Sequence, residues 1–535
     1  MCGISGFCDF SLNYYDKKPF WETILVQMHE TLKHRGPDQA MIDLQPHVGL
    51  SHARLSIRDL KSGIQPMTRT FHGKTCSIVY NGEIYNHREL LPELQAAGYR
   101  FTTTSDTEII LCAYMHFGKN FVEKLNGIFA FAIWDDTNRE LLLYRDRAGT
   151  KPLFYTQTGS SFVFGSEPKA LFCHPDVTPS IDKNSLQEIL AVGPARTSGN
   201  GVFTGVKEVM PGHYHIFCPD GQHDILYWDL PCREHKDSYT QTVQTVSFLV
   251  RDTVERQMVS DVPVCTFLSG GIDSSIVTAL AARHMQKEGK ILNTFSFDFS
   301  ENEKYFKSNA FQPERDLPYV NRMLQYCKTS HTYLECSQEA LFAALSDAVT
   351  AKDLPGMTDV DASLLYFCSE VAKHNKVTLT GECADEIFGG YNIYKEPLAV
   401  PAYDKIPFPI RRFIGKVASH LPKKSGINFL IRRGKKLEDR FIGNAYMFTE
   451  EERKKLENEQ MFEEMKNKLA GLEKEKTVSS YKASFAAQGY PELLATEAAT
   501  AMANGEMDKV FAAQKKFLEQ YEKDVKAKVL KETPR

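Results

Sequence analysis

The order of hydrophobic and polar positions divides the 535-residue chain into three stretches. From residue 1 to about 215, short runs rich in β-branched and aromatic residues, such as residues 77–79 and 128–134, are separated by clusters of Gly, Pro, Asn and Asp. Short runs of this kind between turn residues are typical of β-strands. The first stretch is therefore expected to be dominated by β-sheet.

A different pattern begins near residue 236, after a series of Gly and Pro signals. A helical pattern over residues 239–258 precedes an apolar run at 262–268, a Gly-rich turn and a second helical pattern from Ser274. Further apolar runs occur at residues 292–297 and 377–380, with helical segments between them. Strands that alternate with helices predict a parallel sheet that is covered on both faces.

The last stretch, beyond about residue 450, is dominated by Lys, Glu and Ala. Phe462, Met465, Leu469 and Leu472 are spaced by three and four, which is typical of an amphipathic or coiled helix. The expected domains are residues 2–215, residues 236–455 and a charged helical tail at residues 456–535.

Composition narrows the classes of function. Charged residues make up 25% of the chain, the net charge is only -4, and no basic block is present, so nucleic acid is not an expected partner. The longest apolar stretch, residues 127–134, is far shorter than the roughly 18 residues of a membrane span. Twelve cysteines form no CxxC pair and no regular framework, which favours free thiols. We expect a cytoplasmic protein without a membrane partner.

Cys2 is the cysteine for which the sequence suggests a special role. A small second residue permits removal of the initiator Met, which would leave Cys2 with a free α-amino group. An α-amine titrates near ~8 and can act as a base at neutral pH, so nucleophile and base would belong to one residue. Because any protein can have cysteine second, this position alone does not establish a nucleophile.

A series of sequence blocks follows Cys2 over about 170 residues. The blocks are HRGPD (34–38), RLSIRDL (54–60), QPM (65–67), YNGEIYN (80–86), SDTE (105–108), LNGIFAFAIWD (125–135), RDRAGTKPLFY (145–155) and FGSEPKAL (164–171). In this order they resemble the class II glutamine amidotransferase domain, which has the N-terminal nucleophile fold, an αββα sandwich of the α+β class. The resemblance implies that Cys2 attacks the glutamine side-chain amide, forms a thioester and releases ammonia.

The same resemblance implies an oxyanion hole at Asn81 and the backbone N–H of Gly82, a task that requires preorganised donors. An Asn-Gly pair also suits a tight turn that exposes such an N–H group. For Asn81 taken alone, a hairpin turn is the alternative interpretation.

Glutamine carries a carboxylate and an ammonium group, so its site needs a cation and at least one anion. The resemblance assigns the carboxylate to Arg54 and the ammonium group to Asp106 and the region of Glu83. Leu55 and Ile57 complete the expected glutamine site. Taken individually, Arg54 and Asp106 could instead form surface ion pairs.

A second constellation is SGGIDSS, residues 269–275, which lies between an apolar run and a helical pattern. Small residues let backbone N–H groups close around an anion, and a helix N-terminus adds partial positive charge. No GxxxxGK[ST] sequence is present. SGGIDSS resembles the loop of the ATP pyrophosphatase family, and TGECADEIFGGY (380–391) narrows the resemblance to asparagine synthetases and close relatives.

This resemblance assigns roles around ATP. Asp273 and Asp385 are the expected Mg²⁺ ligands, because Mg²⁺ binds through one or two carboxylates together with phosphate oxygens. Glu382 is expected near the reacting carboxylate, where it would guide ammonia or take a proton. The expected site for ATP and pyrophosphate comprises Leu268, Ser269, Gly270, Gly271, Asp273, Ser274, Phe297, Thr380 and Gly381.

The resemblance to glutamine-hydrolysing asparagine synthetases covers roughly residues 2–455 and includes IGNAYMFTEEER (442–453). The segment that follows in the family, with an Asp-Arg-Met-x-Met pattern, is not found. The tail instead is similar, faintly, to helical scaffolding-type proteins found beside phage capsid genes, and a diverged or recombined terminus is the alternative.

Three hypotheses follow. The first is synthesis of asparagine, glutamate, AMP and pyrophosphate from glutamine, aspartate and ATP through a β-aspartyl-adenylate. The second is a related amide-forming ligase, and the third is a chimera that retains only glutaminase activity and has an assembly-type tail. A homodimer or tail-mediated self-association would accompany these functions.

Overall fold

The computed structural model describes residues 1–192, 195–308, 314–390, 400–421 and 427–435, and in the tail residues 478, 482, 492–503, 509, 512, 513 and 516. The chain divides into two units, Met1–Met447 and Phe448–Arg535. The second unit contains helix α18 (Glu492–Ala503). The block at 442–453 and the predicted amphipathic spacing of Phe462, Met465, Leu469 and Leu472 lie outside the described residues.

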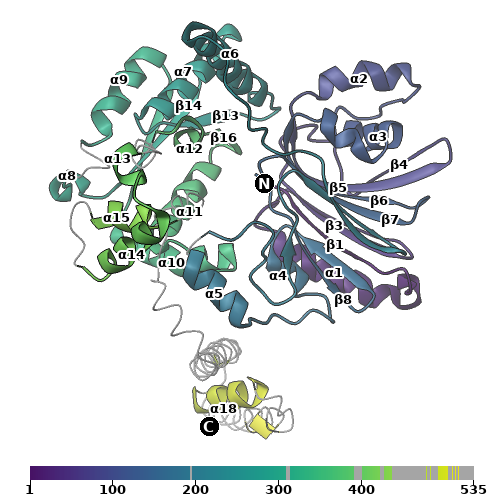
Figure 1. The fold of residues 1–535 in the computed structure, drawn as a ribbon. Coiled ribbons are helices and arrows are strands. Elements are labelled where there is room, and N and C mark those ends of the chain that lie inside the picture. The colour runs from purple at the N-terminus through teal and green to yellow at the C-terminus, as the bar shows by residue number, and fades with distance from the viewer. Residues whose placement is uncertain are drawn as a thin grey trace, which may run out of the picture. The chain divides into compact units, whose positions relative to one another are not determined.

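The N-terminal half of the first unit contains two six-stranded antiparallel sheets (Figure 1). The first has the order β10-β8-β9-β1-β3-β2, built from β1 (Gly3–Cys8), β2 (Gln39–Leu44), β3 (Val48–Arg54), β8 (Phe154–Thr158), β9 (Ser161–Gly165) and β10 (Lys207–Glu208). The second has the order β12-β11-β7-β6-β5-β4, built from β4 (Met67–Phe71), β5 (Lys74–Ile84), β6 (Gly127–Asp135), β7 (Glu140–Arg145), β11 (His213–Cys218) and β12 (Gly221–Leu226).

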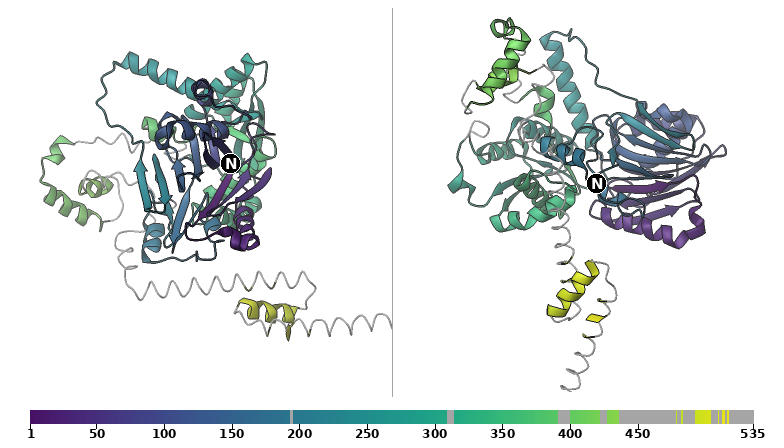
Figure 2. Two further views of the ribbon diagram at one scale, coloured as in Figure 1. Left: turned by 90° about the vertical axis from the view of Figure 1, so that its right-hand side faces the viewer. Right: turned by 60° about the horizontal axis from the view of Figure 1, so that its bottom comes forward.

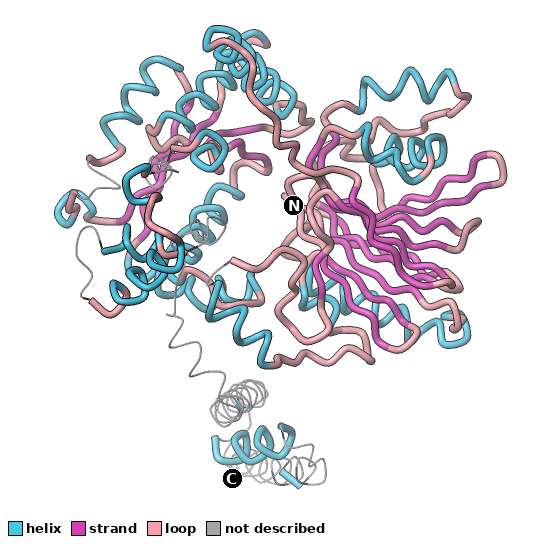
Figure 3. Tube along the Cα trace, viewed as in Figure 1, coloured by secondary structure: helices cyan, strands magenta, loops and turns pink. Residues whose placement is uncertain are grey.

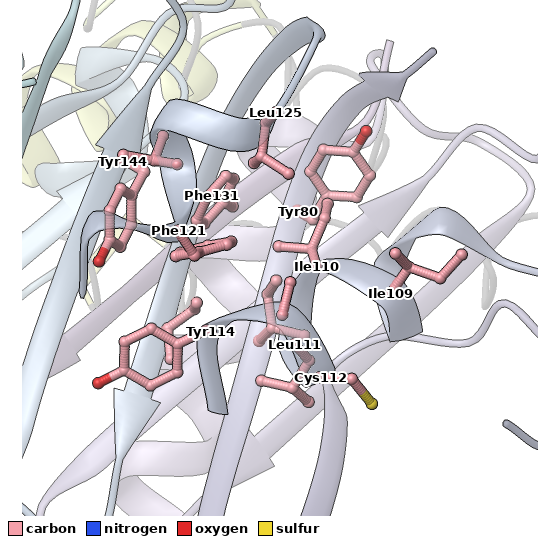
Figure 4. Close-up of a cluster of buried hydrophobic side chains, with 14 of the residues drawn as sticks. Tyr80, Ile109, Ile110, Leu111, Cys112, Tyr114, Phe121, Leu125, Phe131 and Tyr144 are labelled. Atoms are coloured by element: carbon pink, nitrogen blue, oxygen red, sulfur yellow. The ribbon is translucent and has the colours of Figure 1, made fainter. Parts of the chain in front are cut away.

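Helices cover the outer faces of the two sheets. On the first sheet, α1 (Lys18–Leu32) packs Leu25 and Met28 against Phe7 of β1, and α4 (Pro168–Leu171) lies beside it. The right-hand view of Figure 2 shows α1, in purple, along the strands. On the second sheet, α2 (His87–Ala96) and α3 (Asp106–Phe117) pack against β5 and β6, with Tyr114 among the aromatic side chains of Figure 4. The predicted αββα sandwich is confirmed.

Strand β6 explains why the longest apolar run of the chain is a strand. Phe129, Phe131 and Ile133 face the helices, whereas Ala130, Ala132 and Trp134 face the first sheet. Side chains alternate between the two faces of a strand, so a strand that is buried on both faces is apolar throughout.

The C-terminal half of the first unit holds a four-stranded parallel sheet with the order β15-β14-β13-β16 (Figure 3). Its strands are β13 (Val264–Phe267), β14 (Asn293–Phe299), β15 (Ser330–Cys336) and β16 (Val377–Leu379). Around it lie α6 (Tyr239–Gln257), α7 (Ile272–Lys287), α8 (Asn302–Tyr305), α9 (Leu317–Cys327), α10 (Gln338–Lys352), α11 (Thr358–Ala372) and α12 (Ala384–Phe388).

Helices cover both faces of this sheet, as predicted. Val264 of β13 packs with Ala281 of α7 on one face, and Cys265, the next residue, packs with Phe367 of α11 on the other. Ser238 begins α6 with a capping box in which its side chain and that of Gln241 satisfy each other's backbone N–H groups.

The remaining described helices of this unit are short or lie at its periphery. They are α5 (Lys183–Val192), α13 (Pro401–Asp404), α14 (Phe408–Ala418), α15 (Ile427–Arg433) and the 3₁₀ helices Tyr14–Lys17 and Lys119–Lys124. Across the described ranges, no helix combines the length and the apolar character needed to cross a membrane. All twelve cysteines are unpaired, which confirms the interpretation as free thiols.

Trp134 gives a test of the interface between the two antiparallel sheets. We expect Trp134→Ala to lower the free energy of unfolding by about 3–5 kcal/mol, because the buried indole fills the space between the sheets. Trp134→Phe should cost under about 1.5 kcal/mol, since it keeps an aromatic ring and removes Nε1, a buried donor without a partner among the described residues. Urea unfolding followed by circular dichroism measures both, and equal losses would contradict the packing described.

Candidate active sites

One pocket in the N-terminal half gathers every residue that the sequence assigned to the nucleophile and to glutamine. Its lining includes Cys2, Arg54, Leu55, Ile57, Asn81, Gly82, Glu83 and Asp106. They come from the start of β1, the end of β3 and the segment after it, the end of β5 and the start of α3. Residues more than a hundred positions apart in the sequence therefore face one space.

Cys2 is held from two sides. Its Sγ accepts a hydrogen bond from the Leu55 N–H at 3.4 Å, and its carbonyl accepts one from Arg35 Nε at 3.0 Å. Arg35 is itself held by an ion pair of 2.7 Å with Glu167. Burial raises the pKa of the Cys2 thiol, and the hydrogen bond from Leu55 only partly opposes this shift. The thiol is therefore neutral at pH 7 and needs a base to become a nucleophile.

The surroundings of the N-terminus suit an unprotonated amine. Burial lowers the pKa of the Met1 α-amine to about 6, and the positive charges of Arg35 and Lys151 add to this effect. Lys151 Nζ also lies 3.1 Å from Met1 Sδ. Removal of Met1 would expose the α-amine of Cys2 beside the same cations.

Asn81 and Gly82 lie within strand β5, opposite Ala130 and Phe129 of β6. The prediction of a tight turn at this Asn-Gly pair is wrong. The glycine is needed for close approach between strands, since a Cβ on Gly82 would lie 2.2 Å from the Ile128 carbonyl oxygen. The glycine is therefore required by the packing of β5 against β6. An Asn-Gly pair in the sequence does not by itself distinguish this requirement from a turn.

The N–H of Gly82 points away from β6. Its partner Phe129 exchanges hydrogen bonds with Asp146, whose backbone N–H donates to the Phe129 carbonyl at 2.9 Å and whose Oδ2 accepts from the Phe129 N–H at 3.1 Å. Gly82 and Phe129 are thus a non-hydrogen-bonded pair, in which backbone polar groups point outward.

On that outward side, β4 pairs with β5 only as far as Ile78. The N–H groups of Tyr80 and Ile84, which point the same way as that of Gly82, are taken by Gln65 Oε1 at 2.6 Å and Asp106 Oδ2 at 2.9 Å. Between them the N–H of Gly82 faces the pocket.

Asn81 supplies a second donor at this place. Its Nδ2 is buried and has no hydrogen-bond partner among the described residues. A buried amide without a partner costs free energy in the resting protein, so it marks a group that a ligand would satisfy. Two donors beside Cys2 are the arrangement that a developing oxyanion requires.

Arg54 is buried and does not form a surface ion pair. Its guanidinium donates to the backbone carbonyls of Arg58, Asp59 and Leu60 at 3.3, 2.6 and 3.3 Å. These contacts wrap the segment after β3 around the guanidinium. The pocket therefore has a fixed positive group at one end.

Asp106 and Glu83 give the pocket its negative groups. Asp106 is buried, and its Oδ2 accepts from the Tyr80 hydroxyl at 2.9 Å as well as from the Ile84 N–H. Burial raises the pKa of the Glu83 carboxyl well above its usual range, and the charge of Asp106 adds to the shift, while Arg58 opposes it. An ammonium group placed between the two carboxyls would relieve this repulsion.

The pocket also contains residues that the sequence did not assign. They are Met1, Arg58, Gly63, Gln65, Tyr80, Ser105, Thr107 and Lys151. Most belong to the sequence blocks that flank the assigned residues, and Lys151 belongs to RDRAGTKPLFY. For these residues membership of a block was the available signal, whereas Met1 and Gly63 belong to no block.

The residues assigned to ATP lie at the carboxyl edge of the parallel sheet. Leu268 to Ser274 follow β13, Phe297 lies in β14, and Thr380, Gly381 and Glu382 follow β16. Because β13 has β14 on one side and β16 on the other, the chain leaves the sheet in opposite directions here. Ligands of open α/β sheets bind at such a switch point.

Hydrogen bonds shape the loop after β13. The Ser269 N–H donates to Ser274 Oγ at 3.2 Å, and the two hydroxyls lie 3.0 Å apart. Gly270 has a φ of +82°, and a Cβ there would lie 2.7 Å from Tyr319 Cβ. The loop thus closes tightly onto the N-terminus of α7, where backbone N–H groups favour an anion.

Leu268 and Phe297 are placed by the neighbouring strand. Leu268 is buried, its N–H donates to the Phe295 carbonyl at 2.9 Å, and its carbonyl accepts from the Ser296 hydroxyl. Phe297 is half-buried and packs against Phe367 with ring centroids 5.1 Å apart.

The two sequence motifs of this half contact each other. A Cβ on Gly381 would lie 2.7 Å from the Ser274 backbone nitrogen. Burial raises the pKa of Asp273, and the nearby charge of Asp385 raises it further. Glu382 is exposed at the same edge, and its N–H donates to Thr380 Oγ1 at 3.4 Å.

Two family models match the chain. The glutamine amidotransferase domain matches residues 1–228, and the asparagine synthase model matches residues 245–523. The second match extends beyond residue 455, where the resemblance based on the sequence motifs ends.

Curated relatives support the same family. The chain is 49% identical to "Asparagine synthetase [glutamine-hydrolyzing] 3" of Bacillus subtilis over 73% of this chain and 63% of that protein, and 35% identical to "Asparagine synthetase [glutamine-hydrolyzing] 1" of the same organism over 85% and 69%. It is also 32% identical to "Amidase chyE" of Penicillium rubens over 74% of this chain and 60% of that protein. The chain thus spans about 63% of the length of the first of these relatives.

The pocket around Cys2, the loop at the carboxyl edge of the parallel sheet and the matches to both halves lead to one assignment. The chain belongs to the asparagine synthase family, with an N-terminal glutamine amidotransferase domain.

Proposed function

We propose that this chain makes asparagine from aspartate and ATP with ammonia released from glutamine, and that it forms glutamate, AMP and pyrophosphate as the other products. The observation that carries the proposal is the buried, unpartnered Nδ2 of Asn81 in the pocket that contains Cys2. An oxygen of a reacting substrate in this pocket would give that donor a partner.

The first half-reaction takes place at Cys2. After removal of Met1, the α-amine of Cys2 accepts the thiol proton, and Sγ attacks the amide carbon of the glutamine side chain. Asn81 Nδ2 and the Gly82 N–H donate to the oxyanion. The protonated amine then gives its proton to the leaving ammonia, and water hydrolyses the thioester to glutamate.

The fixed charges of the pocket orient glutamine for this attack. Arg54 binds the α-carboxylate, whereas Asp106 and Glu83 bind the α-ammonium group. Leu55 and Ile57 also line this pocket. Glutamine lacking either charged group would lose one of these anchors.

The second half-reaction takes place at the parallel sheet. Ser269, Gly270, Gly271 and Ser274 hold the pyrophosphate part of ATP at the start of α7. Leu268, Phe297, Thr380 and Gly381 surround adenosine. The β-carboxylate of aspartate attacks the α-phosphorus, pyrophosphate leaves, and ammonia then displaces AMP from the β-aspartyl-adenylate. Glu382 guides ammonia or takes its proton.

The acidic residues at this edge fit Mg²⁺. Burial raises the pKa of Asp273 and the charge of Asp385 raises it further, so the two carboxylates lie near each other. Within the described ranges, no group of three or more His, Cys, Asp or Glu side chains could hold a metal ion. Two carboxylates leave coordination positions for phosphate oxygens, which suits Mg²⁺. The bound ion would neutralise the phosphate charge.

We also propose the partners, the cellular location and the domain division of this enzyme. The partners are the small molecules glutamine, aspartate and ATP, with a homodimer or self-association through residues 456–535. Unpaired cysteines throughout the chain support a cytoplasmic location. The proposed functional divisions are residues 2–215 for the amidotransferase, 236–455 for the synthetase and 456–535 for the tail.

A second candidate is a chain that only hydrolyses glutamine. It is favoured by the pocket around Cys2, whose lining residues all come from the N-terminal half of the first unit. Because the pocket around Cys2 is complete without the parallel sheet, hydrolysis alone does not separate the two candidates.

The decisive assay supplies aspartate, MgATP and either glutamine or ammonia. We expect asparagine and pyrophosphate with both nitrogen donors, and Cys2→Ala should abolish only the reaction with glutamine, because the nucleophile is not used with free ammonia. Hydrolysis of glutamine without asparagine from either donor would favour the glutaminase. Loss of both reactions in Cys2→Ala would contradict separate sites.

Asn81→Ala tests the oxyanion donor. We expect kcat for glutamine hydrolysis to fall about 10²–10³-fold, with little loss of thermal stability, because Nδ2 has no partner in the resting protein. Asn86→Ala is the matched control, since Asn86 is also buried but its side chain holds the Lys124 carbonyl and the Asn126 N–H, each at 2.8 Å.

The control should lose stability and keep kcat. Steady-state kinetics and thermal unfolding measure both variants. An Asn81→Ala variant with unchanged kcat would exclude the oxyanion role.

A further inference from the structure

Asp59 connects the two ends of the glutamine pocket, although it does not line the pocket itself. It lies on the segment that follows β3, and it is buried with 8% of its surface exposed. Its backbone carbonyl, its carboxylate and its N–H group each make a separate contact. The three contacts reach three different parts of the chain.

The carbonyl of Asp59 fixes Arg54. Arg54 Nη2 donates to it at 2.6 Å, which is shorter than the 3.3 Å contacts of the same guanidinium with the carbonyls of Arg58 and Leu60. A short, charge-assisted hydrogen bond of this kind holds the guanidinium in one orientation.

The carboxylate of Asp59 fixes the segment that leads to Asp106. Its Oδ2 accepts from the Thr104 N–H at 2.8 Å and from the Thr104 hydroxyl at 3.1 Å. Its Oδ1 accepts from the Ser62 N–H at 2.9 Å and the Ser62 hydroxyl at 2.7 Å. Thr104 stands two residues before Asp106, and the intervening Ser105 caps α3.

The N–H of Asp59 reaches the other half of the unit. It donates to Asp261 Oδ2 at 2.8 Å, and the Asp261 N–H donates to the Ile57 carbonyl at 3.1 Å. Asp261 precedes β13, at whose carboxyl end the nucleotide loop begins. The segment from 57 to 59 is thereby attached to the start of that strand.

We infer that Asp59 is a positioning residue for glutamine: it sets the separation between Arg54, which takes the α-carboxylate, and Asp106, which takes the α-ammonium group. This inference rests on the proposed function of the pocket. Hydrogen bonds from Ser62 and Thr104 outweigh the effect of burial and lower the pKa of Asp59 to about 2, so the carboxylate is charged at every pH of an assay.

Asp59→Asn is a clean test of the carboxylate. Asp59 has a φ of 45°, in the left-handed region that Asn adopts readily, so the substitution adds no backbone strain. The Asn Nδ2 cannot accept a hydrogen bond, so the contacts of one carboxylate oxygen are lost. We expect KM for glutamine to rise about tenfold or more while kcat changes less than about twofold, because Cys2 and Asn81 stay in place.

Asp9→Asn is the matched control. Asp9 is also buried, and its carboxylate accepts from the hydroxyls of Ser11, Ser160 and Ser161 at 2.6, 2.7 and 2.8 Å. It follows the end of β1 opposite to Cys2. Asp9→Asn should lower thermal stability without a change in KM for glutamine. Synthesis with free ammonia should be unchanged in both variants.

The possible results distinguish failure of the role inferred for Asp59 from failure of the proposed function. An unsubstituted chain that fails to hydrolyse glutamine contradicts the proposed function and the inference together. If that chain is active, an unchanged KM in Asp59→Asn, or an equal rise in both Asn variants, overturns the inference alone. Should Asp59→Asn fail to fold, Thr104→Val keeps the carboxylate and removes one contact. A rise in KM for glutamine in Thr104→Val supports the inference, and an unchanged KM overturns it.

Discussion

The interrupted pairing of strand β5 is the constraint on which the pocket around Cys2 depends. Beyond Ile78, which pairs with Met67 at the start of β4, the outward N–H groups of β5 have no partner strand. Gln65 satisfies the N–H of Tyr80 and Asp106 satisfies that of Ile84, so the sheet edge is closed by side chains rather than by backbone. Gly82, between them, directs its N–H to the pocket. If β4 continued alongside Gly82, the Gly82 N–H would donate to the backbone of β4 and would no longer be available to the pocket.

The same edge explains why charged groups are arranged as they are. Asp106 accepts hydrogen bonds from the Tyr80 hydroxyl and the Ile84 N–H, both with Oδ2. It lies at the pocket because α3 begins there. Arg54 ends the neighbouring strand β3 of the other sheet and is held by three carbonyls of the following segment. Opposite charges are therefore fixed on separate elements before any substrate arrives, which lowers the ordering cost of binding.

Sequence reasoning predicted a sheet-rich first stretch and a parallel sheet covered by helices because burial leaves a direct record in composition, whereas the αββα sandwich was implied by the resemblance to class II glutamine amidotransferases. A strand buried on both faces, such as β6, has to be apolar, and alternation of strands with helices indicates a parallel sheet. The clustering of Cys2, Arg54, Asn81 and Asp106 came from a resemblance, and the structure brings them together in one pocket.

Other features could not be read from the sequence. Asn81-Gly82 has the composition of a turn but lies in a strand, because the close approach of Ile128 demands a glycine there. The role inferred for Asp59 depends on contacts with Thr104 and Asp261, which are distant in sequence. Side-chain networks of this kind depend on tertiary packing, so the local amino-acid pattern does not predict them.

The central claim is that nitrogen released at Cys2 reaches aspartate activated at the parallel sheet. The most direct measurement supplies glutamine labelled with ¹⁵N in its side-chain amide, together with aspartate, MgATP and unlabelled ammonium at a concentration equal to that of glutamine. Mass spectrometry then determines the label in the side chain of asparagine. The account predicts asparagine in which most of the side-chain amide carries ¹⁵N, and asparagine with only unlabelled nitrogen, or no asparagine at all, would contradict it.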